Sequence, residues 1–178
     1  MLKNFLRDHH FKIFLGAPII FLIVMNVSND PQSGNFFRLH ASKNSFVRVG
    51  EQVDVTLTFQ TASPVNAVGG TITFTPNIIE VASITRATSM IDLWSEEPSY
   101  ANLGGTIQFS GGMLGDKSTE KISGDVFTAS LSMMKEGVGY VSLANAQLLA
   151  NNGMGTNITS GQNALTFYVR KSGTASPD

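Results

Sequence analysis

The stretch EQVDVTLTFQT, residues 51–61, decides the fold class. Apolar and polar side chains alternate along it: Val53, Val55, Leu57 and Phe59 alternate with Asp54, Thr56, Thr58 and Gln60. Successive side chains of a β-strand point to opposite faces of the sheet, so a period of two gives one apolar face and one wet face. The stretch is therefore predicted to be a half-buried strand that packs on a core along one side.

The same alternation recurs along the rest of the chain. The inward positions that it predicts are Gly70, Ile72 and Phe74; Ile107 and Phe109; Phe127, Ala129, Leu131 and Met133; Val141 and Leu143; and Leu165, Phe167 and Val169. Clusters of glycine, proline and asparagine separate these runs and mark turns. The pattern predicts an all-β protein, an antiparallel β-sandwich with jelly-roll topology and about nine strands.

Residues 140–150 are rich in alanine, which also suits a helix. No long stretch beyond residue 45 repeats its apolar residues at the helical period of 3.6. We therefore interpret residues 140–143 and 147–149 as strands joined through Asn145.

The N-terminus has the pattern of an export or anchoring signal. Lys3, Arg7 and Lys12 precede an apolar run at residues 13–27, which favours one hydrophobic helix with the start of the chain inside and the rest outside. The run is shorter than the ~20 residues of a typical spanning helix, yet no small-x-small cleavage site follows it. Residues 1–28 are predicted to be a signal anchor, with a cleaved signal peptide as the alternative and a buried core helix third.

These patterns divide the chain into four parts. After residues 1–28, a polar spacer is predicted at residues 29–45 and the sandwich domain at residues 46–170, with a flexible tail of serine, glycine, threonine and proline at residues 171–178. The predicted location is the cell membrane, crossed once, with the domain on the extracytoplasmic side. Secretion after signal cleavage is the alternative.

Composition excludes several classes of function. The formal net charge of −1 offers no cationic field for nucleic acid. With no cysteine, the chain has no disulfide, thiolate metal site or cysteine nucleophile. The 3 histidines, His9, His10 and His40, all precede the residue-51 strand, so the body of the domain has no imidazole for a Ser-His-Asp triad. We predict that the protein is not an enzyme and needs no cofactor.

The segment LANNGMGTNI, residues 149–158, is the strongest candidate for a cation site. Its asparagines supply oxygen donors, but it has no carboxylate, which calcium sites normally contain in number. Asparagine and glycine also serve tight turns with positive φ. We interpret the segment as a turn and predict no metal site.

The order of the segments resembles the cohesin domain and the related carbohydrate-binding β-sandwich superfamily. The matching segments, in order, are VRVGEQVDVTLTF, VNAVGGTITFTPNIIEVASI, GTIQFSGG, GDVFTASLSM and QLLANNGMGTNI, and the resemblance covers about residues 46–170. The most specific element is FTPNIIEV at residues 74–81. Pro76 lacks an N–H and fixes its own φ, so it ends the strand and turns the chain, after which Ile79 and Val81 return to the core.

The resemblance implies a nine-stranded jelly roll that binds dockerin modules across one sheet face and so assembles polysaccharide-degrading enzymes. Carried onto this chain, the binding face consists of outward residues of three strands: Thr71, Thr73, Gln108, Ser110, Thr128 and Ser130. Dockerin-binding members carry more carboxylates, amides and aromatics there. This face has small hydroxyls and no large anchor of the Trp, Tyr or Arg kind.

Trp94 and Tyr100 are the candidates for a carbohydrate site, because sugar rings stack on exposed aromatic rings. The alternative interpretation is that Trp94 closes an open end of the core. Three functions stay open at this point: a membrane-anchored module that binds a protein partner, a carbohydrate-binding module whose ligand is a polysaccharide, and a structural surface domain.

Overall fold

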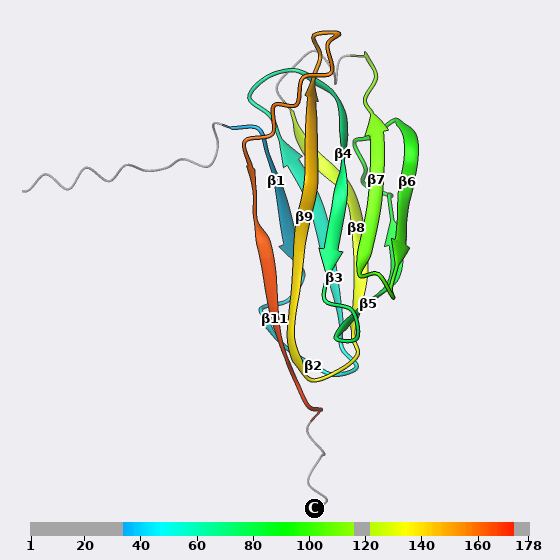
Figure 1. The fold of residues 1–178 in the computed structure, drawn as a ribbon, viewed down its shortest axis with the longest axis vertical. Coiled ribbons are helices and arrows are strands. Elements are labelled where there is room, and N and C mark those ends of the chain that lie inside the picture. The colour runs from blue at the N-terminus through cyan, green and yellow to red at the C-terminus, as the bar shows by residue number, and fades with distance from the viewer. Residues whose placement is uncertain (1–33, 116–121, 173–178) are drawn as a thin grey trace, which may run out of the picture.

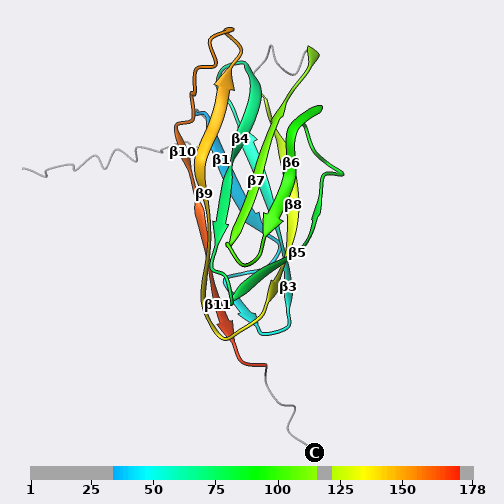
Figure 2. The ribbon, with the colours of Figure 1, turned by 45° about the vertical axis from the view of Figure 1, so that its right-hand side comes forward.

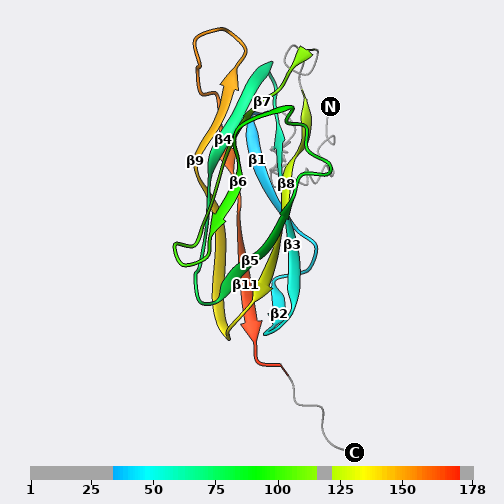
Figure 3. The same ribbon diagram turned by 90° about the vertical axis from the view of Figure 1, so that its right-hand side faces the viewer.

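The computed structural model describes residues 34–115 and 122–172, which form two β-sheets packed face to face (Figure 1). The five-stranded sheet has the order β10 (Gly161–Gln162), β1 (Phe36–Ala41), β3 (Gln52–Gln60), β8 (Ser123–Met133) and β5 (Ile79–Thr85). The six-stranded sheet has the order β2 (Phe46–Arg48), β11 (Ala164–Arg170), β9 (Gly137–Ala150), β4 (Val65–Phe74), β7 (Thr106–Gly112) and β6 (Leu93–Ala101). Figure 3 shows the two layers edge-on. The predicted all-β sandwich is confirmed.

The chain passes from one sheet to the other at almost every connection. Within the described residues, β6 and β7 are the one consecutive pair that shares a sheet, and they form an antiparallel hairpin at its edge (Figure 2). The first and last strands are joined by parallel pairing, β1 with β10 and β2 with β11. Strand neighbours therefore come from distant parts of the sequence.

The core lies between the sheets and is built by the predicted alternation. In β3 the buried positions are Val53, Val55, Leu57 and Phe59. Phe109 of the six-stranded sheet meets two rings of the other sheet edge-on, Phe37 at 6.5 Å and Phe127 at 5.3 Å between ring centroids. Such edge-to-face aromatic packing across the sheets adds to the stabilisation from burial.

The predicted boundary of the domain at residue 46 is wrong. Strand β1 lies inside the stretch that was predicted to be a spacer, and it pairs along its whole length with β3. Its inward residues Phe37 and Leu39 are 1% and 2% exposed. Arg38 and His40 give the stretch its polar composition, but they alternate with core residues, which is the pattern of a half-buried strand.

The predicted N-terminal helix and the first part of the spacer lie outside the described residues, as does most of the predicted tail. Among residues 34–115 and 122–172, no helix has the length and apolar character to span a membrane. At the other end, the Ser172 hydroxyl donates to the carbonyl oxygen of Val49 at 2.6 Å, so residue 172 still contacts the domain.

Two predicted irregularities fall where expected. Asn145 has a φ of 51° and coincides with a register shift between β4 and β9, although β9 is one long strand rather than two. After Pro76, Asn77 has a φ of 69°, and Ile79 and Val81 are buried. The segment at residues 74–81 is thus a corner of the sandwich, as predicted.

Candidate binding faces

The six predicted partner-binding residues do not share a face. Thr71 and Thr73 of β4 and Gln108 and Ser110 of β7 belong to the six-stranded sheet. Thr128 and Ser130 lie on β8, in the opposite sheet, so they point away from the other four. The single face expected from the sequence is therefore wrong. Strands β6 and β7 form a hairpin within the six-stranded sheet, and the chain then crosses to the five-stranded sheet to form β8.

The four residues of the six-stranded sheet form the middle of its outer face, and they are bonded to their neighbours. The hydroxyls of Thr73 and Ser142 are 2.9 Å apart, and Ser95 donates to the Ser110 hydroxyl at 3.0 Å. Thr71 pairs with Gln108 across the β4–β7 ladder. The middle of this face is thus low and polar, with short side chains whose hydroxyls are already partly satisfied.

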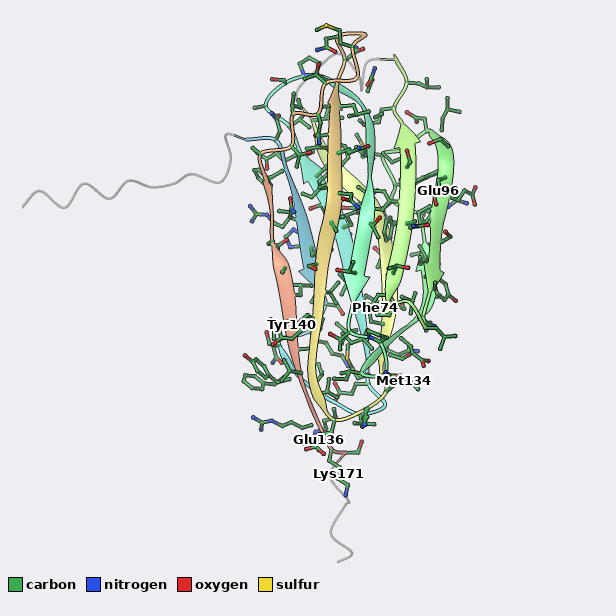
Figure 4. All side chains as sticks on the ribbon, viewed as in Figure 1. Phe74, Glu96, Met134, Glu136, Tyr140 and Lys171 are labelled. Carbon is green, nitrogen blue, oxygen red and sulfur yellow. The ribbon has the colours of Figure 1, made fainter. Side chains whose placement is uncertain are left out.

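One end of the same face carries exposed aromatic side chains, which we call the aromatic ridge: Phe46 of β2, Tyr168 of β11 and Tyr140 of β9. Their exposed fractions are 58%, 45% and 56%. Phe46 and Tyr168 are register partners whose rings stack at 5.3 Å with 24° between their planes. Tyr140 pairs with Thr166, two residues from Tyr168, and so is its diagonal neighbour on the sheet. Figure 4 shows Tyr140 near the lower end of β9.

The ridge is bordered by positive charge. The Arg170 guanidinium lies 5.0 Å from the centre of the Phe46 ring, and Arg48 is the register partner of Arg170. The stacked Tyr168 and the guanidinium are both close neighbours of Phe46, so this ring is fixed in place by its surroundings. An exposed side chain that is already ordered loses little entropy when a partner binds it.

The aromatic ridge was not predicted from the sequence. The inward assignments of Val141, Phe167 and Val169 already put Tyr140 and Tyr168 on the outer side of their strands. What the sequence lacks is the information that β2, β11 and β9 are neighbours, since they are far apart along the chain.

Trp94 and Tyr100, the predicted carbohydrate residues, lie on β6. Their register partners on β7 are Gly111 and Ile107, and Ile107 is buried in the core. Trp94 is half-buried, and the Arg86 guanidinium lies 5.7 Å from its ring centre. Arg86 also forms an ion pair with Glu97 at 2.8 Å. Trp94 packs against the core, which agrees with the interpretation that it closes an open end. Carbohydrate stacking on these rings stays a prediction.

The segment at residues 149–158 folds as a turn. Gly153 and Gly155 have positive φ, and Asn152 accepts a hydrogen bond from the Met154 N–H at 3.0 Å. Asn157 Oδ1 accepts from the backbone N–H groups of Leu148 and Thr159. The asparagine oxygens thus serve the backbone of the turn. Over the two described ranges, no three His, Cys, Asp or Glu side chains gather as metal ligands would.

Comparison with solved structures identifies the fold as cohesin-like. A non-cellulosomal cohesin from Archaeoglobus fulgidus matches 77% of this chain and 91% of its own length, with a TM-score of 0.59 and 13% identity. The cohesin module of a family 33 glycoside hydrolase from Clostridium perfringens covers 79% and 99%, with a TM-score of 0.59 and 13% identity. A type I cohesin–dockerin complex from Clostridium thermocellum gives 79% and 97%, with a TM-score of 0.60 and 10% identity.

No family model matches the sequence, and no curated protein matches it. At these identities the structural likeness establishes the fold, while function has to be argued from the surface of this chain.

Proposed function

We propose that the domain is a binding module for a protein partner of the dockerin kind, and that it binds through the outer face of the six-stranded sheet. The observation that carries the proposal is the aromatic ridge on this face. Solved cohesins with the same fold have been described in complex with dockerins, which supports the choice of partner.

The ridge supplies what the predicted face lacked. Protein interfaces draw most of their binding energy from a few anchors, with Trp, Tyr and Arg over-represented among them. Tyr140, Tyr168 and Arg170 are residues of these types, and they lie at one end of the face. The short side chains of β4 and β7 beside them leave room for a partner to approach the sheet closely.

The test is a binding assay against a panel of dockerin modules, by calorimetry on the purified full-length chain. Tyr140→Ala and Tyr168→Ala are each expected to weaken binding about tenfold or more, because each removes a buried anchor from the complex. Tyr100→Ala is the matched control, since Tyr100 is similarly exposed, at 44%, but lies away from the ridge on β6. Its affinity is expected to stay within about twofold of the unmodified chain.

Two results contradict the proposal. One is no measurable binding to any dockerin of the panel. The other is an equal loss of affinity for Tyr100→Ala and the two ridge variants, which places the contact elsewhere.

We further propose that the module is non-catalytic and is displayed on the extracytoplasmic side of the cell membrane, with a link to polysaccharide degradation through its partner. The positively charged start of the chain and the apolar run at residues 13–27 support the location. Cell fractionation with protease shaving tests it, and recovery of the chain from the cytosol contradicts it. Release of reducing sugar from soluble polysaccharides by the purified protein contradicts the non-catalytic assignment.

A further inference from the structure

The outer face of the five-stranded sheet, on the far side of the sandwich from the ridge, contains a hollow of about 320 Å³. Strands β1, β3 and β8 line it. The polar side chains that matter here are Arg38 and His40 of β1, Thr58 and Gln60 of β3, and Asp125 of β8, with Phe36 as an apolar wall. Its volume is at the lower end of the range for small-molecule sites, which suits one ring rather than a protein.

Opposite charges stand on the two sides of this hollow. Arg38 pairs with Thr58, and Thr58 pairs with Asp125, so the three residues form one row across the sheet. Neighbouring strands are ~4.8 Å apart, which separates the backbones of β1 and β8 by about 10 Å. No ion pair joins Arg38 to Asp125 within the described ranges. The two charges can therefore act on opposite ends of one ligand.

A β-bulge places Asp125 in this row. On β8 the inward residues Phe127 and Ala129 follow the alternation, and an unbroken strand would bury residue 125 as well. The register instead shifts between Leu57 and Thr58, so that Val126 is the extra, buried residue and Asp125 faces outward. Bulges commonly re-aim a side chain beside a functional site.

The groups around the hollow are held in position. The Thr88 hydroxyl donates to Asp125 Oδ2 at 2.7 Å, and the Arg38 guanidinium lies 5.1 Å from the centre of the Phe36 ring. The floor is low because the Thr58 hydroxyl is turned to the carbonyl oxygen of Arg38, at 3.3 Å. Binding needs little rearrangement of such a site.

We propose that this hollow binds a sugar ring that carries a carboxylate, such as a uronic or sialic acid. The ligand carboxylate accepts hydrogen bonds from Arg38 and His40, while hydroxyls at the other end of the ring donate to Asp125 and Gln60. A free amino acid fits less well, because its ammonium and carboxylate are attached to one carbon and cannot reach both sides. This site is independent of the proposed protein-binding face.

The test is a titration of the purified full-length chain by calorimetry, with glucuronate, galacturonate and N-acetylneuraminate as probes. Saturable binding of one or more of them is expected, and the probe that binds identifies the source of the sugar. Glucose, acetate and alanine are the comparison ligands, and each is expected to bind about tenfold more weakly or not at all.

Arg38→Gln and Asp125→Asn are each expected to weaken binding about tenfold, since each removes one charged end of the site. Asn at residue 125 keeps an oxygen acceptor for Thr88, so the local fold is retained. Arg48→Gln on the other sheet is the matched control and is expected to leave affinity unchanged. Circular dichroism melting of each variant shows that it is folded.

Three results overturn the proposal: no binding of any acidic sugar, acetate or alanine binding as well as the sugars, or no effect of Arg38→Gln and Asp125→Asn in folded variants. None of these bears on the dockerin assay, because the ridge lies on the opposite sheet.

Discussion

The side-chain amide of Asn102 makes both hydrogen bonds that a neighbouring strand would make to Val81. The Val81 N–H donates to Asn102 Oδ1 at 2.8 Å, and Asn102 Nδ2 donates to the Val81 carbonyl oxygen at 3.1 Å. Val81 lies on β5, an edge strand of the five-stranded sheet. At the other side of this sheet, Asn163 makes the same pair of bonds to Leu39, at 2.7 and 3.0 Å. Two asparagines thus protect the polar backbone of buried residues, one on the edge strand β5 and one on the part of β1 beyond its pairing with β10.

Asn102→Ala is expected to lower the free energy of unfolding by about 1–3 kcal/mol, because it leaves the N–H and carbonyl groups of the buried Val81 without these partners. Urea denaturation at equilibrium measures the change. Gln52→Ala, an exposed position on β3, is the control and is expected to change stability by less than about 0.5 kcal/mol. Equal stability of the two variants would show that water replaces the amide without cost.

Phe109→Ala is expected to destabilise the protein by about 3–5 kcal/mol, since Phe109 is buried and contacts Phe37 and Phe127 of the other sheet. Phe46→Ala removes a ring of the same size from the exposed ridge and is expected to cost far less, below about 1 kcal/mol. Thermal unfolding followed by circular dichroism compares them. Similar losses would mean that the ridge is part of the core rather than a free surface.

Gly105→Ala is expected to be more destabilising than Gly153→Ala, although both glycines have positive φ, 62° and 72°. Positive φ costs an alanine about 1–2 kcal/mol at either position. At Gly105 the added Cβ also collides with the carbonyl oxygen of Phe74, whereas nothing lies within 4 Å at Gly153. Overpacking adds about 1–3 kcal/mol at Gly105 alone. Chemical denaturation measures the free energy of unfolding of the two variants. Equal losses of stability would contradict the predicted collision at Gly105.

Trp94→Ala is expected to lower the melting temperature and to leave polysaccharide pull-down unchanged, because the ring packs on the core beneath Arg86. As Trp94 is the sole tryptophan of the sequence, its fluorescence also reports on this edge in the unmodified protein. Loss of polysaccharide capture with an unchanged melting temperature would favour the stacking hypothesis instead.

The sequence predicts strands and their inward faces well, because burial imposes a period of two on each strand by itself. In β3 and β4 the residues predicted to face inward, such as Leu57 and Ile72, are buried. Strand neighbours are harder to predict, since partners such as β2 and β11 are separated by more than a hundred residues. This is why Thr128 and Ser130 were assigned to the wrong face and why the grouping of Phe46, Tyr140 and Tyr168 was missed.

Bulges also escape an analysis of alternation. The extra residue Val126 changes the face on which Asp125 lies. Gly124 stands beside the bulge, but a glycine near the start of a strand also marks an ordinary turn. The spacer error at β1 has another cause, since the composition of a whole stretch was given more weight than the alternation of Phe37 and Leu39 within it.

The parallel pairings at the two ends of the chain have a consequence for how the protein is made. Within the part of the chain that the structure describes, strand β2 pairs only with β11, and β11 is the last strand there. During synthesis β2 therefore cannot take its place in the sheet until β11 has been made, and this pairing closes a long loop. A ribosome stalled before β11 would expose a domain that is still open along one side.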